Sequence, residues 1–266
     1  MVKIGIIGGS GMYSLLENAD EVQKETEYGA PSDNISVGSI EGVDVAFIPR
    51  HGKNHTIPPH KVPYKANIEA LNGMGVERII ATNAVGSLNP GYKPGDFALF
   101  DQFINFTSGR DDTFFHGPDV IHISTAEPFC PELRGIASRK AAESGLGMHS
   151  GGSVAVINGP RFSSKAESKY FRAAGADMIN MTLYPEVALA KEKSMCYLGI
   201  GLVTDYDSGL EGDPNIKPVD YNEVGKMFAA NVPKLKALIA AIVKDIPEKR
   251  EACSCSKSLE GAQVKA

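Results

Sequence analysis

Two groups of residues in this 266-residue chain have types and spacings suited to binding an anion. The glycine-rich segment 8–11 follows the first apolar run, and residues without a Cβ let backbone N–H groups approach an anion closely. Arg50 and His51 follow a second apolar run, where a guanidinium offers paired N–H donors and an imidazole offers another. The sequence therefore predicts a site for phosphate or another oxyanion, with surface solvation of Arg50 and His51 as the alternative.

The glycine-rich segment has two other interpretations, a plain tight turn and a dinucleotide-binding turn. The dinucleotide fingerprint G-x-G-x-x-G requires a third glycine where Ser14 stands, so the pattern is broken. An anion-binding turn is the interpretation that we favour.

Two carboxylates, Asp205 and Asp207, stand on either side of Tyr206 at the end of an apolar run typical of a buried strand. Strand alternation points both side chains to one side if the strand persists that far. Carboxylates in such a place bind a metal, cap a helix or exchange a proton with a ligand. Because two of them occur together, we favour a role in ligand chemistry.

Histidine and cysteine spacing does not indicate a metal site. His51 and His55 have the i, i+4 spacing of helical zinc ligands, but glycine and a Pro-Pro pair nearby favour a loop, and no H-E-x-x-H pattern occurs. Cys253 and Cys255 form an isolated C-x-C in the polar tail, which is too few ligands for structural zinc. Whether these two thiols are bonded to each other stays open.

Short apolar runs alternate with helical patterns along the chain, and these elements must position the polar residues. We expect strands at residues 3–7, 43–48, 78–82, 97–100, 153–157, 178–181 and 196–204. We expect helices at residues 65–72, 132–144, 164–173, 185–193 and 221–244, with Pro233 kinking or breaking the last one. This alternation predicts an α/β fold with a mostly parallel central sheet flanked by helices. Ligands bind beyond the carboxyl ends of such strands, and six of the predicted ends carry glycine or polar residues, so we expect one shared site.

Composition excludes several classes of protein. With 42% hydrophobic and 22% charged residues the chain falls in the range of globular proteins, and no apolar run approaches the roughly 18 residues of a membrane span. The start of the chain lacks a signal-peptide pattern, so we expect a cytoplasmic protein without a membrane partner. With a net charge of −5 and interspersed charges there is no basic patch for a phosphate backbone, so we expect no nucleic-acid partner. Because neither a linker nor a repeat divides the chain, we expect one domain, residues 1–250, followed by a tail, residues 251–266.

The order and spacing of the motifs are similar to those of a known family. The motifs are GIIGGSG at residues 5–11, RHGKNHTI at 50–57, AVGSL at 84–88, AEPFCP at 126–131, GPRF at 159–162, NMT at 180–182 and TDYD at 204–207. Together they closely resemble the methylthioadenosine phosphorylase family of the purine nucleoside phosphorylases. The resemblance implies a single-domain phosphorylase-type fold and a homotrimer with its site near the subunit boundary. It also implies phosphorolysis of 5'-methylthioadenosine to adenine and 5-methylthioribose 1-phosphate, with inorganic phosphate as co-substrate and with neither organic cofactor nor metal.

The resemblance also assigns a role to particular residues. Phosphate binding falls to Ser10, Arg50, His51, Asn83, Ala84 and Thr182. The family more often has threonine at positions 10 and 83, so the amide of Asn83 is the clearest departure from its pattern. The substrate-binding residues are Met181 at the ribose, Phe162 beside the base, Asn180, His122 reaching the 5'-substituent in a neighbouring subunit, and Val219 where the pocket-lining helix begins.

Asp205 and Asp207 are the catalytic, base-binding pair under this resemblance. Breaking the N-glycosidic bond develops negative charge on the purine, so a carboxyl group with a raised pKa at Asp205 supplies a proton at N7. An ionised Asp207 accepts from the 6-amino group, which favours adenine over a 6-oxopurine. One apolar group discriminates by only about 1–3 kcal/mol, so acceptance of adenosine stays open.

Three alternatives remain at this point. The first is a phosphorylase of 6-oxopurine nucleosides or of methylthioinosine. The second is a purine-binding module without catalysis, which would have no need of Arg50 and His51. The third is a nicotinamide dehydrogenase, which the broken glycine fingerprint disfavours.

Overall fold

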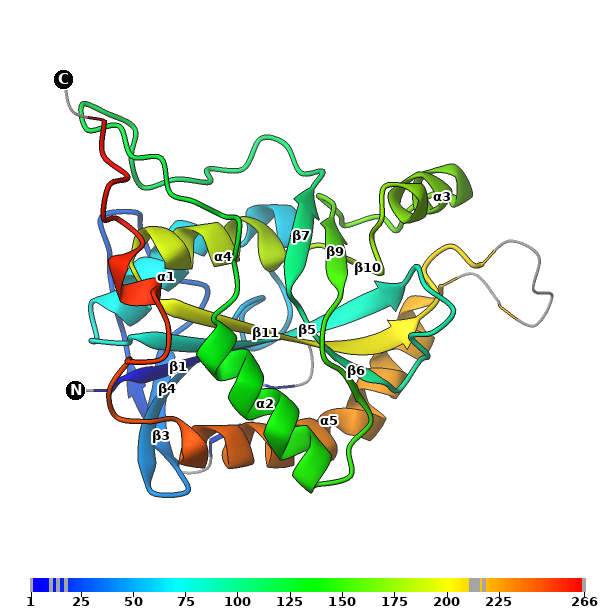
Figure 1. Cartoon of the computed structure of the whole chain (residues 1–266), viewed down its shortest axis with the longest axis horizontal. Coiled ribbons are helices and arrows are strands. Elements are labelled where there is room, and N and C mark those ends of the chain that lie inside the picture. Colours follow the sequence, from blue (N-terminus) through cyan, green and yellow to red (C-terminus); the bar gives the residue numbers. More distant parts are fainter. Residues whose placement is uncertain are drawn as a thin grey trace.

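The fold is built around one mixed sheet, shown by a computed structural model (Figure 1) that describes residues 2–9, 12, 15–16, 19–210, 216 and 219–264. The strands are β1 (Ile4–Gly8), β2 (Asp20–Val22), β3 (Ile35–Ile40), β4 (Val43–Pro49), β5 (Arg78–Ser87), β6 (Phe97–Leu99), β7 (Gln102–Asn105), β8 (Met148–His149), β9 (Ser153–Val156), β10 (Met178–Asn180) and β11 (Cys196–Asp205). The helices are α1 (Tyr64–Asn72), α2 (Pro131–Glu143), α3 (Lys165–Ala173), α4 (Leu183–Glu192) and α5 (Tyr221–Asp245), with the 3-10 turns η1 (Pro59–Lys61) and η2 (Cys255–Lys257).

Strands β5 and β11 form the centre of the sheet. They run parallel from the pair Arg78 and Cys196 to the pair Gly86 and Asp205, with a bulge just before the last pair. β1 lies parallel between β4 and β5, and β10 joins β5 to β9. Among the described strands, six pairings are parallel and four antiparallel. The prediction of a mostly parallel sheet is confirmed.

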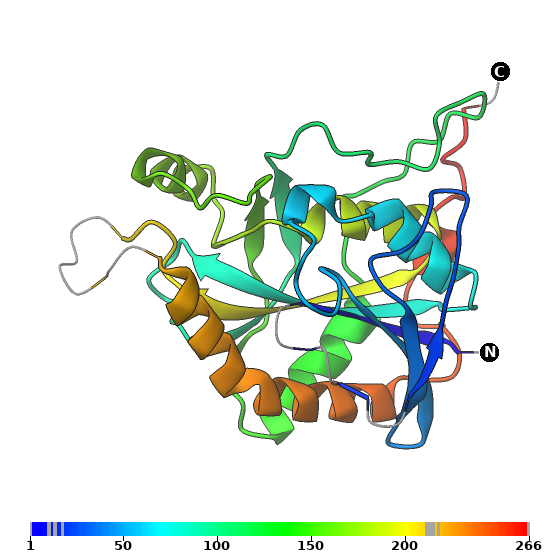
Figure 2. The ribbon, with the colours of Figure 1, turned by 180° about the vertical axis from the view of Figure 1, so that it is seen from behind.

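Helices cover both faces of this sheet (Figures 1 and 2). α1 and α4 pack together on one face, and α2 and α5 pack together on the other. The apolar side of each helix is buried, for example Leu71 in α1 and Ile239 in α5. The predicted α/β class is therefore confirmed, and the carboxyl ends of the parallel strands are where a ligand is expected.

Helix starts and bends follow local sequence signals. Ser164 and Glu167 form a reciprocal capping box at the start of α3, and the Asp220 carboxylate accepts two backbone N–H groups at the start of α5. Pro233 lies inside α5 and cannot donate a backbone hydrogen bond. The helix continues through Pro233, so it does not break there, and Figure 2 shows α5 bent along its length.

The structure differs from the sequence prediction in two respects. β5 does not end at Thr82 but continues to Ser87, because its polar residues go on pairing with β11 and are buried. The strands β2, β3, β7 and β8 were not predicted, since β2 and β7 are partly exposed and β8 has only two residues. Within the described parts of the chain, no helix has the length and apolar character to cross a bilayer.

Candidate active site

A cavity of about 540 Å³ opens at the carboxyl ends of β4, β5, β10 and β11. Segment 157–163 and the start of α5 complete its wall. Ten of the residues predicted from the sequence line it, and they are Arg50, His51, Asn83, Ala84, Phe162, Asn180, Met181, Thr182, Asp205 and Asp207. The expectation that the polar strand ends share one site is thus confirmed, and this volume suits a nucleoside-sized ligand.

The glycine turn after β1 packs closely at one end of the cavity. A Cβ on Gly9 would lie 2.9 Å from the carbonyl oxygen of Thr82 and 3.4 Å from Nη1 of Arg50, so only glycine fits. The Gly9 N–H donates to Oγ1 of Thr82 at 3.1 Å. This amide is therefore engaged within the protein and is not the free anion donor that the turn predicted. Ser10 and Gly11 lie outside the described residues.

Arg50 is buried and held by a buried carboxylate that the sequence analysis missed. Its Nε and Nη2 donate to the two carboxylate oxygens of Glu186 at 2.7 and 2.8 Å, and Nη1 donates to the Thr82 carbonyl at 2.9 Å. Burial alone would lower the pKa of Arg50, but the Glu186 carboxylate raises it above its usual value. The paired N–H donors that were expected to bind an oxyanion are thus partly engaged within the protein. Each Nη nitrogen carries a second N–H beyond these bonds, and Arg50 lines the cavity.

Glu186 also accepts from the Tyr197 hydroxyl at 2.6 Å, so one fully buried carboxylate orients two groups. It stands alone as a charged residue in the apolar segment 183–190 at the start of α4. A single carboxylate in an apolar segment could have been recognised in the sequence as a buried group, and a buried carboxylate requires a positively charged or hydrogen-bonding partner.

His51 differs from its predicted role as a donor. Its Nδ1 lies 2.8 Å from the carbonyl oxygen of Ile57, which can only accept, so Nδ1 carries the proton. Burial, together with the Arg50 charge, lowers the pKa of His51 to about 4. The ring is neutral at pH 7, and its Nε2 is an acceptor.

Asn83 and Thr182 lie side by side near Arg50. The Thr182 hydroxyl donates to Oδ1 of Asn83 at 3.4 Å, and Nδ2 of Asn83 is buried without an acceptor among the described residues. The Asn180 side chain links two of these segments. Its Nδ2 donates to the Ala84 carbonyl, and its Oδ1 accepts from the Thr182 N–H at 2.7 Å. Asn83 therefore leaves one unsatisfied donor at this end of the cavity, where a ligand oxygen would satisfy it.

The two predicted carboxylates lie at the other end of the cavity. Asp205 accepts from the Thr204 hydroxyl and from the Asp207 N–H, both at 2.7 Å. Burial raises the pKa of Asp205 to about 6 and raises the pKa of Asp207 as well. Oδ2 of Asp207 is buried without a donor among the described residues. This end thus offers a carboxyl group that is readily protonated and an acceptor oxygen that lacks a partner.

The backbone that presents these carboxylates is irregular. β11 ends at Asp205 after the bulge, so the strand does not persist to Asp207 as the alternation argument required. Asp207 instead turns into the cavity with a φ of 51°, a left-handed conformation that aspartate tolerates better than most residues. Gly86 makes room for the pair, because a Cβ there would lie 3.0 Å from Oδ1 of Asp205 and 3.2 Å from Cβ of Asp207.

Apolar side chains form the wall between the two ends. Met181 packs so closely on Gly159 that a Cβ there would lie 2.4 Å from the methionine sulfur. The Phe162 side chain lines the cavity and stays 36% exposed, which leaves part of its ring open to a ligand. Tyr221 and Val224, at the start of α5 where the pocket-lining helix was expected, add to this wall.

Arg110 was also missed, and it ties together the segments that carry this wall. It donates to the carbonyl oxygens of Met181 at 2.7 Å and Asn158 at 3.1 Å, and to that of Tyr184. It stands in an irregular polar segment of the chain, where no sequence pattern distinguishes it from a surface arginine.

Comparison with known proteins agrees with this geometry. The family described as "Phosphorylase superfamily" matches residues 3–244. The chain is 53% identical over 265 residues to the S-methyl-5'-thioadenosine phosphorylase of Thermofilum pendens, with 99% of each chain covered. It is 54% identical over 260 residues to that of Pyrococcus furiosus, with 98% of each covered. Among solved structures, methylthioadenosine phosphorylase from Schistosoma mansoni in complex with adenine matches with a TM-score of 0.89 and 36% identity, covering 98% of this chain and 96% of that one.

The chain belongs to the methylthioadenosine phosphorylase family. The resemblance stated from the motifs is thereby confirmed over the whole chain, and the match from residue 3 to 244 agrees with one phosphorylase-type fold. The roles that the family pattern assigns to single residues stay predictions, although ten of those residues share the cavity.

Three residues of the family pattern do not line the cavity of the described chain. Ser10 lies outside the described residues. Val219 is next to the site, since its N–H donates to the Asp207 carbonyl at 3.0 Å, but Tyr221 and Val224 take the lining position expected of it. His122 is exposed and outside the cavity, so a contact with this chain's own site is not formed.

Proposed function

We propose that the chain catalyses phosphorolysis of 5'-methylthioadenosine to adenine and 5-methylthioribose 1-phosphate. The observation that carries this proposal is that buried polar atoms without a hydrogen-bond partner share one cavity, namely the donor Nδ2 of Asn83, the Ser163 hydroxyl and the acceptor Oδ2 of Asp207. Buried polar atoms are rarely left unsatisfied, so each marks a place for a ligand group of opposite kind. The printed function of relatives over 50% identical supports the same reaction.

At the Arg50 end, the positive charge and the N–H donors suit a phosphate ion. The Arg50 guanidinium and the Nδ2 amide of Asn83, which has no acceptor among the described residues, present donors to phosphate oxygens. Cleavage of the N-glycosidic bond develops positive charge on the sugar, which a phosphate anion held against C1' stabilises. The same phosphate then forms the new bond to C1' as the nucleophile.

His51 accepts a hydrogen bond from the phosphate rather than donating one. Its Nδ1–H is engaged by Ile57 and its ring is neutral, so Nε2 accepts from the P–OH group of a monoprotonated phosphate. This arrangement replaces the donor role predicted from the sequence.

At the carboxylate end, the residues suit an adenine base. The leaving purine gains negative charge, and Asp205, with a pKa raised to about 6, shares or donates a proton at N7. Oδ2 of Asp207 accepts from the 6-amino group, which supplies the missing donor. A 6-oxopurine has an acceptor at that position and would leave two acceptors facing each other.

The sugar lies along the apolar wall between the two ends. We place Met181 against the ribose and the half-open ring of Phe162 beside the base. Val224 and Tyr221 contribute apolar surface suited to a 5'-methylthio group. Acceptance of adenosine as a second substrate is supported by solved relatives described as adenosine/methylthioadenosine phosphorylase from Schistosoma mansoni.

We also propose a homotrimer in which His122 reaches the site of a neighbouring subunit. His122 is exposed and held away from its own cavity, as that role requires. A solution mass near 28.4 kDa, that of one chain, would contradict this assembly, and a mass about three times larger would support it.

The reaction itself is tested with phosphate labelled with 18O at all four oxygens. In phosphorolysis the oxygen bonded to C1 of the sugar is a phosphate oxygen, so the sugar 1-phosphate retains all four labelled oxygens. Release of adenine together with a free, unphosphorylated sugar would identify a hydrolase instead.

A further inference from the structure

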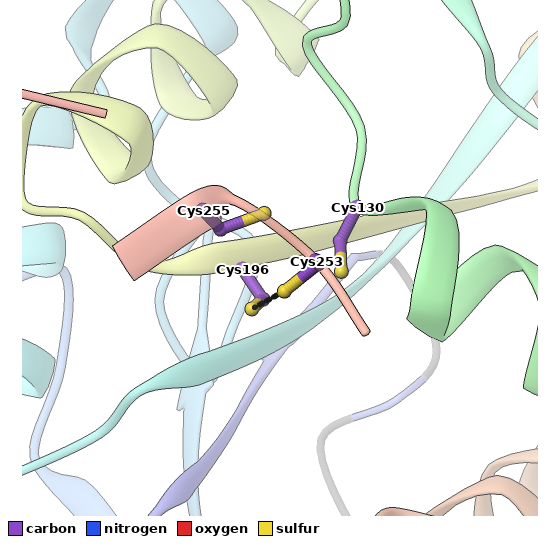
Figure 3. Close-up of side chains that lie close together, drawn as sticks. All are labelled: Cys130, Cys196, Cys253 and Cys255. Carbon is purple, nitrogen blue, oxygen red and sulfur yellow. Dashed lines mark hydrogen bonds between the residues drawn. The ribbon is translucent and has the colours of Figure 1, made fainter. Parts of the chain in front are cut away.

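Four cysteines that are far apart in the sequence meet beside the first residue of β11 (Figure 3). Cys130 is the N-cap of α2, Cys196 begins β11, and Cys253 and Cys255 come from the C-terminal tail. The four Sγ atoms all lie within 4.8 Å of one another. The assumption that the C-x-C pair stands isolated is therefore wrong in three dimensions, because the fold adds two further thiols to it.

The spacing of the sulfur atoms suits four ligands around one ion. Zinc held by four cysteines at about 2.3 Å places its sulfurs about 3.8 Å apart. The Sγ atoms of Cys196 and Cys253 lie 3.5 Å apart, and the other pairs fall within the 4.8 Å limit. All four cysteines are free thiols in the structure. A small contraction or expansion of this cluster gives a tetrahedral site.

Two of the thiols are rigidly placed by the sheet and helix. The Cys130 N–H donates to the Tyr197 carbonyl, and the Cys196 N–H donates to the Glu77 carbonyl, both at 2.9 Å. Both side chains are buried. A ligand pair that is fixed before the metal arrives reduces the ordering cost of binding.

The surroundings are apolar and favour bonds between a metal and thiolates. Cys130 and Cys196 belong to the apolar cluster between the sheet, α2 and α5, and the two tail cysteines pack against it. Soft thiolate ligands in a tetrahedral arrangement select zinc among the common divalent ions.

We propose that Cys130, Cys196, Cys253 and Cys255 bind one zinc ion in a structural site that fixes the C-terminal tail. Four protein ligands complete the tetrahedron and leave no open position for substrate, so the site has no part in phosphorolysis. On binding, each thiol passes its proton to solvent and its sulfur forms a bond to zinc, with no change of oxidation state.

The tail that this site fixes contacts two other parts of the chain. The Ser258 hydroxyl donates to the Lys191 carbonyl at 2.6 Å. Further along, the His122 N–H donates to the Ala262 carbonyl at 2.8 Å, and the Val264 N–H donates to the Val120 carbonyl at 3.0 Å. Zinc loss should therefore loosen segment 120–122 as well as the tail.

Metal content of the full-length protein tests the proposal directly. The protein is produced and purified under reducing conditions, incubated with zinc, freed of excess ion and analysed by elemental and native mass spectrometry. We expect one zinc per chain, and four additional reactive thiols when a strong chelator removes it. Replacement by cobalt should give the sulfur-to-cobalt charge-transfer band and the intense visible bands of a tetrahedral thiolate site.

Matched variants assign the ion to these residues. Cys253→Ser combined with Cys255→Ser should abolish stoichiometric zinc, whereas Ser254→Ala, between them, should retain one ion per chain. Hydrogen exchange at residues 120–122 should rise in the chelated protein. If the double variant does not fold, the zinc content and cobalt spectrum of the unchanged chain still decide the question.

Wild-type protein with less than about a tenth of a zinc per chain after this treatment would overturn the proposal, as would full retention of zinc by the double variant. Two disulfide bonds that persist through reducing purification would overturn it as well. None of these measurements uses a nucleoside, so failure here is distinguishable from failure of the proposed phosphorolysis.

Discussion

The two ends of the cavity are built from different kinds of structure. At the proposed phosphate end, Arg50 follows β4, Asn83 lies within β5, and the buried carboxylate of Glu186 fixes the guanidinium. At the proposed base end, Phe162 and Asp207 stand on irregular segments, one partly exposed and the other in a left-handed conformation.

The binding of the two substrates therefore depends on the fold in different ways. The groups for phosphate are part of the sheet and its buried ion pair, so their loss should affect both stability and catalysis. The groups for the base stand on connecting segments, so their loss should change activity and base preference with little effect on stability.

The largest expected effect is that of Glu186→Gln. The substitution leaves the buried Arg50 charge without its carboxylate, and breaking such a pair typically costs about 3–5 kcal/mol. We expect a clear fall in Tm and a loss of at least about a hundredfold in kcat/KM for phosphate. Thermal unfolding and steady-state kinetics with varied phosphate measure the two effects.

Glu192→Gln is the matched control, since Glu192 is also buried in α4 but accepts from Thr113 and Phe114, away from the cavity. This control should leave KM for phosphate unchanged. An unchanged phosphate KM in Glu186→Gln would show that the ion pair does not orient Arg50 for phosphate.

The second effect concerns the base end. Asp205→Asn removes the carboxyl group that supplies a proton at N7, and activity on adenine nucleosides should fall at least about tenfold. Tm should not fall, because the substitution removes a buried charge. Asp220→Asn is the control, because asparagine caps a helix as well as aspartate does and Asp220 lies outside the cavity. Undiminished turnover in Asp205→Asn would remove Asp205 from the mechanism.

The third effect is a pH dependence that only the base end should cause. The pKa of Asp205 is raised to about 6, so its protonated fraction falls about fivefold from pH 6 to pH 7. We expect kcat/KM for the nucleoside, measured at saturating phosphate, to decline with an apparent pKa near 6, and this limb to disappear in Asp205→Asn. His51, with a pKa lowered to about 4, should add no limb between pH 5 and 8.

The same shift affects stability with a definite sign. Because folding raises the pKa of Asp205, the folded state is favoured at low pH, and this contribution is lost as the pH rises through about 6. Relative to the unchanged protein, Asp205→Asn should therefore gain stability above pH 6. Free energies of unfolding from urea titrations at pH 5 and pH 7.5 should reveal a smaller pH dependence in the variant.

The smallest effect is expected from Phe162→Ala. A half-open ring beside the base contributes about 0.5–1.5 kcal/mol by stacking, so KM for the nucleoside should rise about threefold while KM for phosphate stays unchanged. Tyr170→Ala removes another exposed aromatic ring, outside the cavity, and should change neither constant. If the two substitutions change KM for the nucleoside equally, Phe162 does not contact the base.

Sequence patterns predicted the phosphate end better than the contacts that hold it. Arg50 and His51 stand directly after an apolar strand, where position along the sheet is fixed, so their meeting with Thr182 and Asn83 could be foreseen. Glu186 could not be assigned to Arg50, because the pair is 136 residues apart and depends on how α4 packs.

Dependence on contacts that the sequence does not specify also explains the wrong predictions for His51 and for the tail cysteines. The donor assigned to His51 depended on a hydrogen bond with Ile57 across a loop, which residue types alone do not specify. The tail cysteines seemed isolated because Cys130 and Cys196 reach them only through the packing of β11 and α2. Sequence spacing determines which residues follow a strand, but long-range packing determines what each side chain contacts.

One competition experiment tests the two-ended cavity most directly. Equal amounts of methylthioadenosine and methylthioinosine are mixed with the enzyme, with and without inorganic phosphate, and the free purines are quantified. The account predicts that adenine is released in large excess over hypoxanthine and only when phosphate is present. Preferential release of hypoxanthine would contradict the roles of Asp205 and Asp207, and adenine release without phosphate would contradict the role of the Arg50 end.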